Sequence, residues 1–177
     1  MRACAGRCRA VAAFVLIFAM PGAVGAQRPA IPNDTLPRAD LSWSMRTLDG
    51  ERLTLERFRG RVILINSWAT WCEPCVAELS SMQVLRDAIA DASLVFALVT
   101  PQRKEPVAEF VRRRALRLPV YLEMSQAPAV YRFDAVPTTW IVDREGRIVF
   151  RHRGAMRWDT PAVQRFVRSL LSADEPR

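Results

Sequence analysis

Cys72 and Cys75 are separated by two residues, a spacing typical of a dithiol that forms and breaks a disulfide. A short apolar run, 62–67, precedes them, and apolar residues recur at helical spacing after them. This pattern predicts that Cys72 lies at the start of a helix and Cys75 one turn inside it. A helix N-terminus carries free N–H groups and partial positive charge, which stabilise a thiolate. We therefore expect Cys72 to attack a disulfide and Cys75 to resolve the mixed disulfide.

The two residues between the cysteines also bear on this chemistry. Pro74 suits the first turn of a helix, because its missing N–H would have no partner there. Glu73 places a carboxylate beside the thiols, so we expect it to disfavour the Cys72 thiolate and make the pair more reducing. Zinc binding is the competing interpretation, but a structural zinc site needs more ligands than one such pair supplies. Beyond residue 26 the chain adds one histidine, His152, for which we expect no chemical role.

The first 26 residues have the pattern of a secretory signal. Arginines precede an unbroken apolar run, and small residues close the segment at Ala26. We expect export to the periplasm with cleavage after Ala26, which would remove Cys4 and Cys8; the alternative is an uncleaved segment that anchors the protein to the membrane. Residues 27–40 contain three prolines and no periodic apolar pattern, which predicts a flexible linker.

The net charge of +8 comes almost entirely from arginine, since Lys104 is the only lysine. No basic run is interleaved with the aromatic residues that single-strand binding requires, so we expect no nucleic-acid partner. Arg112, Arg113 and Arg114 are typical of a solvated helix face, with attraction to an acidic partner or membrane surface as the alternative.

Periodicity predicts alternating strands and helices. A hairpin is predicted at Asp49-Gly50, and further strands over 62–67, 94–99, 138–142 and 148–153. Helices are predicted over 75–90, 105–115 and 161–171, with a short helix over 127–133. The order predicts an α/β fold with a central mixed sheet, helices on both faces and an N-terminal β-hairpin extension. We expect one domain over 41–172 and a tail over 173–177.

Two segments carry a family resemblance. Residues 66–75, NSWATWCEPC, followed by AEL at 77–79, closely resemble the active-site segment of the TlpA-like branch of the thioredoxin superfamily. Residues 136–143, VPTTWIVD, with Gly146, resemble the second signature of that family. The resemblance implies the thioredoxin fold from about Leu41 to Leu171. It also implies an exported, often membrane-tethered, thiol–disulfide oxidoreductase.

The resemblance implies roles that the spacing leaves open. It implies a cis Val136–Pro137 bond against the cysteine pair, with nearby backbone free to bind an extended client segment. It also implies that Glu78, on one helix face with Cys75, assists proton transfer at the thiols; the alternative is an exposed helix glutamate. The residues that we expect to contact the client are Trp71, Glu73, Pro74, Val136 and Pro137.

The chain departs from its relatives at two positions. Asn66 stands where cytosolic thioredoxins carry a buried aspartate, so proton handling is expected to fall to Glu78 or water. Ser80 stands where many relatives place a proline, so the first helix is expected to lack a kink. We expect Trp68 to serve core packing.

The pattern and the resemblance together predict a reductase of client disulfides that uses no cofactor beyond its own Cys72–Cys75 disulfide. The resemblance implies a membrane electron donor, and the best-known client in this branch is the haem-binding cysteine pair of apocytochromes c. Residues 151–154, RHRG, loosely match maturation members of the branch; a copper-delivery protein or a misbridged exported protein is an equally open client. A peroxidase is disfavoured, because Ala69 stands where peroxiredoxins need Thr or Ser. A thioredoxin-fold protein that binds copper(I) through its thiols is the alternative function.

Overall fold

The protein is described by a computed structural model over residues 36–172. The predicted signal, the linker up to residue 35 and the tail over 173–177 lie outside these residues. The strands are β1 (Ser44–Thr47), β2 (Arg52–Thr54), β3 (Val62–Ser67), β4 (Leu94–Thr100), β5 (Val120–Glu123), β6 (Thr138–Val142) and β7 (Ile148–Arg153). The helices are α1 (Glu73–Ile89), α2 (Lys104–Arg113) and α3 (Pro161–Leu171).

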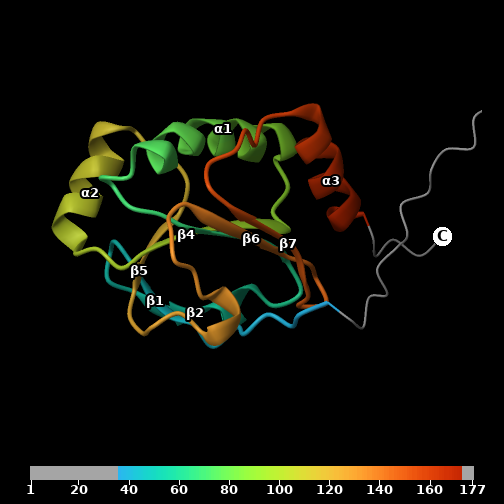
Figure 1. The fold of residues 1–177 in the computed structure, drawn as a ribbon, viewed down its shortest axis with the longest axis horizontal. Helices are drawn as coiled ribbons and strands as arrows, with labels where there is room; N and C mark the ends of the chain where they lie inside the picture. Colours follow the sequence, from blue (N-terminus) through green and yellow to red (C-terminus); the bar gives the residue numbers. More distant parts are fainter. Residues whose placement is uncertain (1–35, 173–177) are drawn as a thin grey trace, which may run out of the picture. The chain divides into compact units, whose positions relative to one another are not determined.

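The strands form one mixed sheet in the order β2-β1-β5-β4-β3-β6-β7 (Figure 1). Strand β3 lies near its centre, parallel to β4 and antiparallel to β6. Every residue of β3 and β4 is buried, as expected for strands covered on both faces. The mixed sheet and its flanking helices confirm the predicted α/β class, and β1 and β2 confirm the predicted hairpin.

Two apolar clusters cover the two faces of the sheet. Alternate residues of β3 divide between them, with Val62 and Leu64 on one face and Ile63 and Ile65 on the other. The first cluster includes side chains from all three α-helices, whereas the second is closed by residues around Trp43 and by short 3-10 helices at Leu55–Phe58 and Ala129–Tyr131.

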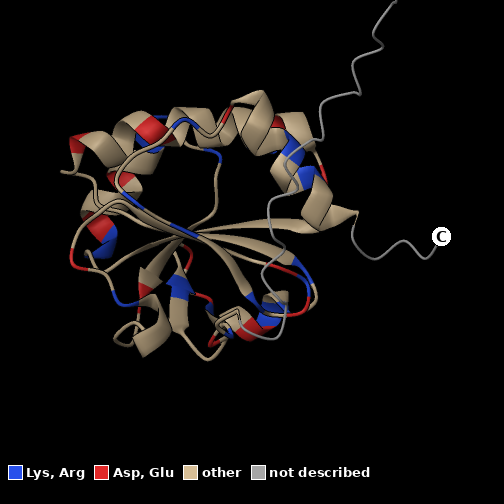
Figure 2. Cartoon of the chain, turned by 45° about the vertical axis from the view of Figure 1, so that its right-hand side comes forward, with Lys and Arg blue, Asp and Glu red and all other residues tan. Residues whose placement is uncertain are grey.

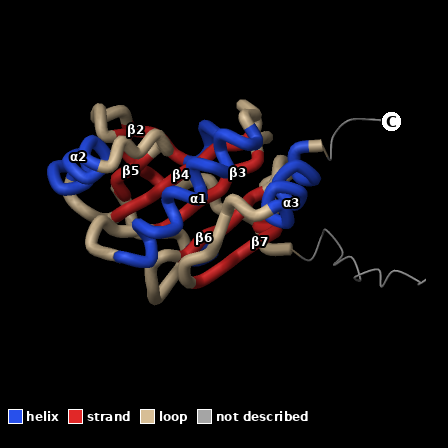
Figure 3. The backbone as a smooth tube through the Cα atoms, turned by 90° about the horizontal axis from the view of Figure 1, so that it is seen from above, coloured by secondary structure: helices blue, strands red, loops and turns tan. Residues whose placement is uncertain are grey.

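The prediction of helices on both faces is therefore wrong for the part of the chain that the structure describes. Helices α1, α2 and α3 all lie on one side of the sheet, and Figure 3 looks down on that side. The segment over 127–133, predicted as a short helix, contains only a single 3-10 turn. The second face is filled instead by large aromatic side chains, with Trp43 stacked on Tyr131 at 5.4 Å between ring centroids.

Two further features differ from the predictions. Strand β5 was not predicted, because four residues are too few to establish a period; it pairs with β4 and β1 and so joins the hairpin to the sheet. The predicted linker also ends earlier than Asp40. Ile148 N donates to Pro37 O at 2.8 Å and Ala39 N donates to Gly146 O at 2.9 Å, so residues 37–39 pair with the start of β7.

Acidic and basic side chains are interspersed over several elements (Figure 2). Many of the arginines are paired with nearby carboxylates, as in the Arg113–Glu109 pair on α2. Within residues 36–172, no helix is both long enough and apolar enough to cross a membrane.

Candidate active site

The cysteine pair lies where β3 passes into α1. Cys72 is the N-cap of α1, and the Cys75 N–H points at Cys72 Sγ with an N···S distance of 3.2 Å. The two sulfurs form a disulfide, with Cα atoms 5.2 Å apart. Once the disulfide is reduced, the same N–H and the helix dipole would stabilise a thiolate on Cys72. Cys72 retains 5% of its surface exposed and Cys75 none, so the sulfur at the cap is the one open to a partner.

Exposed side chains surround the cap on its outer side. Trp71 is 74% exposed, an unusual position for a residue of this size, and Glu73 and Pro74 are also exposed. Pro74 lies in the first turn of α1, where its missing N–H leaves no hydrogen bond unmade. The expected client-contact residues of this segment therefore do lie at the surface beside Cys72.

The loop before the cap is held by a residue that the sequence analysis did not identify. Gln102, which follows β4, accepts from Thr70 N at 2.7 Å and donates from Nε2 to Thr70 Oγ1 at 3.0 Å. Both ends of the amide therefore hold the backbone two residues before Cys72. No periodic pattern signalled this contact, because Gln102 and Thr70 meet only when β3 and β4 pair.

The Val136–Pro137 segment faces the same sulfur. The peptide bond is cis, as the resemblance implies. Val136 O lies 3.7 Å from Cys72 Sγ, a packing contact while the sulfur is oxidised and carries no hydrogen. Gly154 N donates to Pro137 O at 2.8 Å, which ties this segment to the end of β7. Val136 N donates to no described residue, so this N–H is available to an extended segment laid beside it.

Behind the disulfide, the Glu78 carboxylate is buried with 2% of its surface exposed. The alternative of an exposed helix glutamate is therefore wrong. Three N–H groups donate to the carboxylate: Asn66 Nδ2 to Oε1 at 2.9 Å, and Trp158 Nε1 and Met156 N to Oε2 at 3.1 and 3.2 Å. Burial raises the pKa of Glu78, because desolvation outweighs these hydrogen bonds. A buried carboxyl with a raised pKa can take up and release a proton closer to neutral pH than an exposed one.

The partners of Glu78 come from distant parts of the chain. Asn66 also donates to Thr139 Oγ1 on β6 at 2.8 Å, and Trp158 N donates to Ser81 Oγ on α1 at 3.1 Å. Sequence reasoning singled out Asn66 as a replacement for aspartate but missed Thr139, Trp158 and Ser81. One signal for a buried polar network was available in the sequence. Asn66 is a polar residue on the same face of β3 as the apolar Val62 and Leu64.

His152 lies on β7 opposite Thr139, and its ring stacks on Phe150 at 6.3 Å between centroids. Electrostatic interaction with His152 lowers the pKa of the Glu78 carboxyl, a smaller effect than burial. Trp68 is fully buried and packs against Phe110 of α2, which agrees with the predicted role in the core. Helix α1 runs without interruption through Ser80. Among the described residues, no group of three or more His, Cys, Asp or Glu side chains is placed to hold a metal ion.

Comparison with known proteins places this geometry in a family. The Redoxin family profile matches residues 28–167. Over 117 residues the chain is 33% identical to the thioredoxin-like protein YneN of Bacillus subtilis, covering 64% of this chain and 69% of that protein. Over 109 residues it is 27% identical to the thiol-disulfide oxidoreductase ResA of Bacillus thuringiensis, covering 60% of this chain and 63% of ResA. The chain thus spans less than two thirds of the length of this second relative.

Solved structures show the same fold. A thiol:disulfide interchange protein of the thioredoxin family from Chlorobium tepidum superposes with a TM-score of 0.64 at 22% identity, covering 77% of this chain and 97% of that one. StoA of Bacillus subtilis superposes with a TM-score of 0.58 at 22% identity, covering 73% and 96%. With a Cys72–Cys75 disulfide at the head of α1 and a sequence profile that spans most of its length, the chain belongs to the Redoxin family, among its thioredoxin-like thiol–disulfide oxidoreductases.

Proposed function

We propose that this protein reduces disulfides of exported client proteins in the periplasm and is itself re-reduced by a membrane thiol–disulfide donor. The observation that carries the proposal is the position of Cys72 Sγ, 3.2 Å from Cys75 N and 3.7 Å from Val136 O. One contact favours a thiolate, and the other places that sulfur beside backbone that can hold a client. The proposal needs no cofactor beyond the disulfide.

The reduction follows two exchanges. The Cys72 thiolate attacks one sulfur of the client disulfide, which breaks that bond, forms a mixed disulfide and releases the first client thiolate. Cys75, once deprotonated, then attacks Cys72 Sγ, which forms the Cys72–Cys75 disulfide and releases the second client thiolate. Two electrons pass to the client, and the protons lost by the enzyme thiols balance those taken up by the client thiolates.

Glu78 is the acceptor that we propose for the Cys75 proton. Both residues are buried and lie three positions apart on one face of α1. Asn66 on β3 cannot accept the proton as a carboxylate would. The carboxyl group that we propose for this role is therefore that of Glu78 on α1. The raised pKa of Glu78 supports an exchange of protons between the two groups near neutral pH.

The outer residues Trp71, Glu73 and Pro74, with Val136 and Pro137, form the surface that we propose for the client. An apocytochrome c cysteine pair is one candidate client, supported by the loose resemblance of residues 151–154 to cytochrome-maturation members of the branch. Insulin reduction by the dithiol form tests general reductase activity, and apocytochrome c peptides test this client.

The reduction potential decides the direction of electron flow. A value near that of thioredoxin, about −270 mV, supports a reductase, whereas one near −120 mV would identify an oxidant.

Alkylation with iodoacetamide gives an independent test. We expect Cys72 to react faster at neutral pH than free cysteine, and equal rates would overturn the thiolate assignment. Stoichiometric copper(I) binding without insulin turnover would favour the copper-binding alternative.

A further inference from the structure

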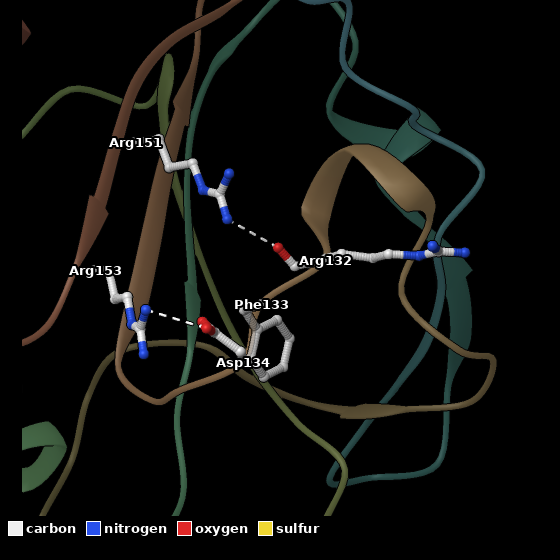
Figure 4. Close-up of a pocket in the computed structure, with 5 residues that line it drawn as sticks. All are labelled: Arg132, Phe133, Asp134, Arg151 and Arg153. Atoms are coloured by element: carbon white, nitrogen blue, oxygen red, sulfur yellow. Dashed lines mark hydrogen bonds and ion pairs between the residues drawn. The ribbon is translucent and has the colours of Figure 1, made fainter.

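An open hollow of about 520 Å³ lies beside the cis-proline segment, on the face of the sheet away from the helices. It is lined by Arg132, Phe133, Asp134, Arg151 and Arg153, and these residues are called the arginine hollow below (Figure 4). They come from two chain segments, the one that leads into Val136–Pro137 and the outer strand β7. Neither segment was assigned a binding role by the sequence motifs, apart from the loose match at 151–154.

The arginine hollow carries more positive than negative charge. The guanidinium groups of Arg151 and Arg153 lie on the same side as the Asp134 carboxylate, whereas the Arg132 side chain extends away from them and contributes its backbone carbonyl (Figure 4). Arg153 pairs with Asp134 at 3.0 Å, and both side chains remain more than half exposed. Arg151 lies over the Trp140 ring, 5.9 Å from its centroid, and donates to Arg132 O at 2.9 Å. Arg151 forms no ion pair with any carboxylate in residues 36–172, so its charge is not compensated there.

The geometry also connects the hollow to the cysteine pair. The register of β6 and β7 places Arg153 opposite Thr138, the residue that follows Pro137, and Arg151 opposite Trp140. Gly154 N donates to Pro137 O at 2.8 Å, which closes the end of β7 onto the cis-proline segment. Asp134 lies two residues before Val136. A polypeptide held at the Val136 backbone would therefore have guanidinium groups within a few residues of its disulfide.

We propose that the arginine hollow binds an acidic stretch of the client polypeptide, adjoining the disulfide to be reduced. Guanidinium groups donate paired hydrogen bonds to carboxylates, and Arg151 lies over the Trp140 ring, which helps to hold it in place. A protein occupant is favoured over a lipid surface, because the adjoining cis-proline segment offers an unpaired backbone N–H suited to a peptide. This inference rests on the proposed function and narrows it to clients with Asp or Glu near their reducible cysteines.

The test uses two disulfide peptides of otherwise identical sequence. One has glutamates beside its cysteines, and the other has glutamines at the same positions. The measured quantity is the second-order rate constant for oxidation of the reduced protein by each peptide. We expect the glutamate peptide to react about three- to tenfold faster in low salt, since a few exposed ion pairs give an effect of this size. The ratio should fall toward one in about 0.5 M salt, which screens exposed charges.

Variants locate the effect. The double variant Arg151→Gln/Arg153→Gln should bring the rate ratio close to one, and Arg153→Gln alone should lower it by about half if the double variant folds poorly. The matched control is Arg112→Gln/Arg113→Gln, an equal loss of charge at two exposed positions of α2 that do not line the arginine hollow, and it should keep the ratio.

Each result has a distinct meaning. Equal rates of the wild-type protein with both peptides, or a ratio that survives in the Arg151/Arg153 variant, would overturn the arginine hollow as a client site while leaving reductase activity intact. Failure to react with either peptide would overturn the proposed function itself. Binding to anionic phospholipid vesicles that depends on Arg151 and Arg153, without a peptide preference, would assign the hollow to a membrane and also overturn this inference.

Discussion

The first two turns of α1 have two different surroundings. On the outer side, Trp71, Glu73 and Pro74 are exposed and adjacent in the chain to the sulfur that they surround. On the inner side, Glu78 is buried and is held by groups from β3 and from the segment after β7. Local sequence therefore determines the side that we propose for the client, while tertiary contacts determine the side where we propose that the proton is handled.

The contrast also extends to what each side tolerates. An exposed charge interacts weakly, because water and salt screen it. A buried carboxylate depends on every donor that it keeps, because each unsatisfied group in the interior costs free energy. Changes on the inner side should therefore alter rate and stability together, and changes on the outer side should alter client reactivity with little loss of stability.

Replacing each cysteine in turn should give the largest effects, because Cys72 and Cys75 are expected to carry out different steps of the exchange. We expect Cys72→Ser to abolish reduction of a disulfide peptide, because the nucleophile is lost. Cys75→Ser should still attack once and then accumulate the mixed disulfide, because no second thiol releases the product. Mass spectrometry under non-reducing conditions distinguishes the two outcomes. Steady turnover by Cys75→Ser would show that an external thiol resolves the mixed disulfide. Cys75 and Glu78 would then not be needed for the resolving step.

Glu78→Gln tests the proposed proton acceptor. We expect the resolving step to slow on the order of 10²-fold near neutral pH, a typical loss for a missing general base. Stopped-flow measurement of Trp fluorescence after mixing with a disulfide peptide would record this step across pH. Glu105→Gln on α2, an exposed glutamate, is the matched control and should behave as the wild type. Identical pH profiles for Glu78→Gln and the wild type would rule out a role for this carboxyl in proton transfer.

The same variant gives a stability test with a definite sign. Because the pKa of Glu78 is raised in the folded protein above the reference 4.5, the folded state holds this proton more tightly than the unfolded chain. The contribution of Glu78 to the free energy of unfolding is therefore greatest below pH 4.5, declines as pH rises toward the folded pKa, and is constant above it. Urea unfolding of the oxidised wild type and of Glu78→Gln at several pH values should show this decline in the difference between their free energies of unfolding, because the other titrating groups, such as Glu123, contribute equally to both.

Trp158→Phe removes one donor and keeps an aromatic ring in the core. We expect a loss of about 2 kcal/mol in the free energy of unfolding, the usual value for a buried hydrogen bond to a charged group. The pKa of Glu78 should rise further, since the Trp158 hydrogen bond lowers it, and the pH–rate profile should move to higher pH. Trp71→Phe is the control on the outer side and should change stability by less than about 0.5 kcal/mol. Equal losses in the free energy of unfolding for Trp158→Phe and Trp71→Phe would contradict the proposed difference between the buried and the exposed side of α1.

Glu73→Gln should give the smallest effect. Removing this exposed carboxylate favours the Cys72 thiolate, so the pair should become less reducing by about 10 mV, the size expected for one screened charge. Equilibration with glutathione buffers measures the potential, and the shift should vanish in high salt. An unchanged reduction potential in low salt would show that Glu73 does not influence the reduction potential of the Cys72–Cys75 pair.

Several elements followed directly from the sequence. The bounds of β3, β6, β7 and α3 agree with the prediction, because buried strands and a Thr-Pro helix start are local patterns. The side of the sheet occupied by each helix did not follow, nor did strand β5. Crossovers between parallel strands are right-handed, so the face that a helix covers depends on the order of the strands in the sheet, and periodicity does not record that order.

By itself, the sequence determined that a dithiol lies at a strand-to-helix junction and that its first cysteine caps the helix, since both properties depend on residues within a few positions of Cys72. Only the tertiary structure decided that Glu78 is buried under Asn66 and Trp158, and that Arg153 and Arg151 lie opposite Thr138 and Trp140 on β6. These contacts join residues from distant parts of the chain, so their energies arise from packing and strand register that no local pattern records.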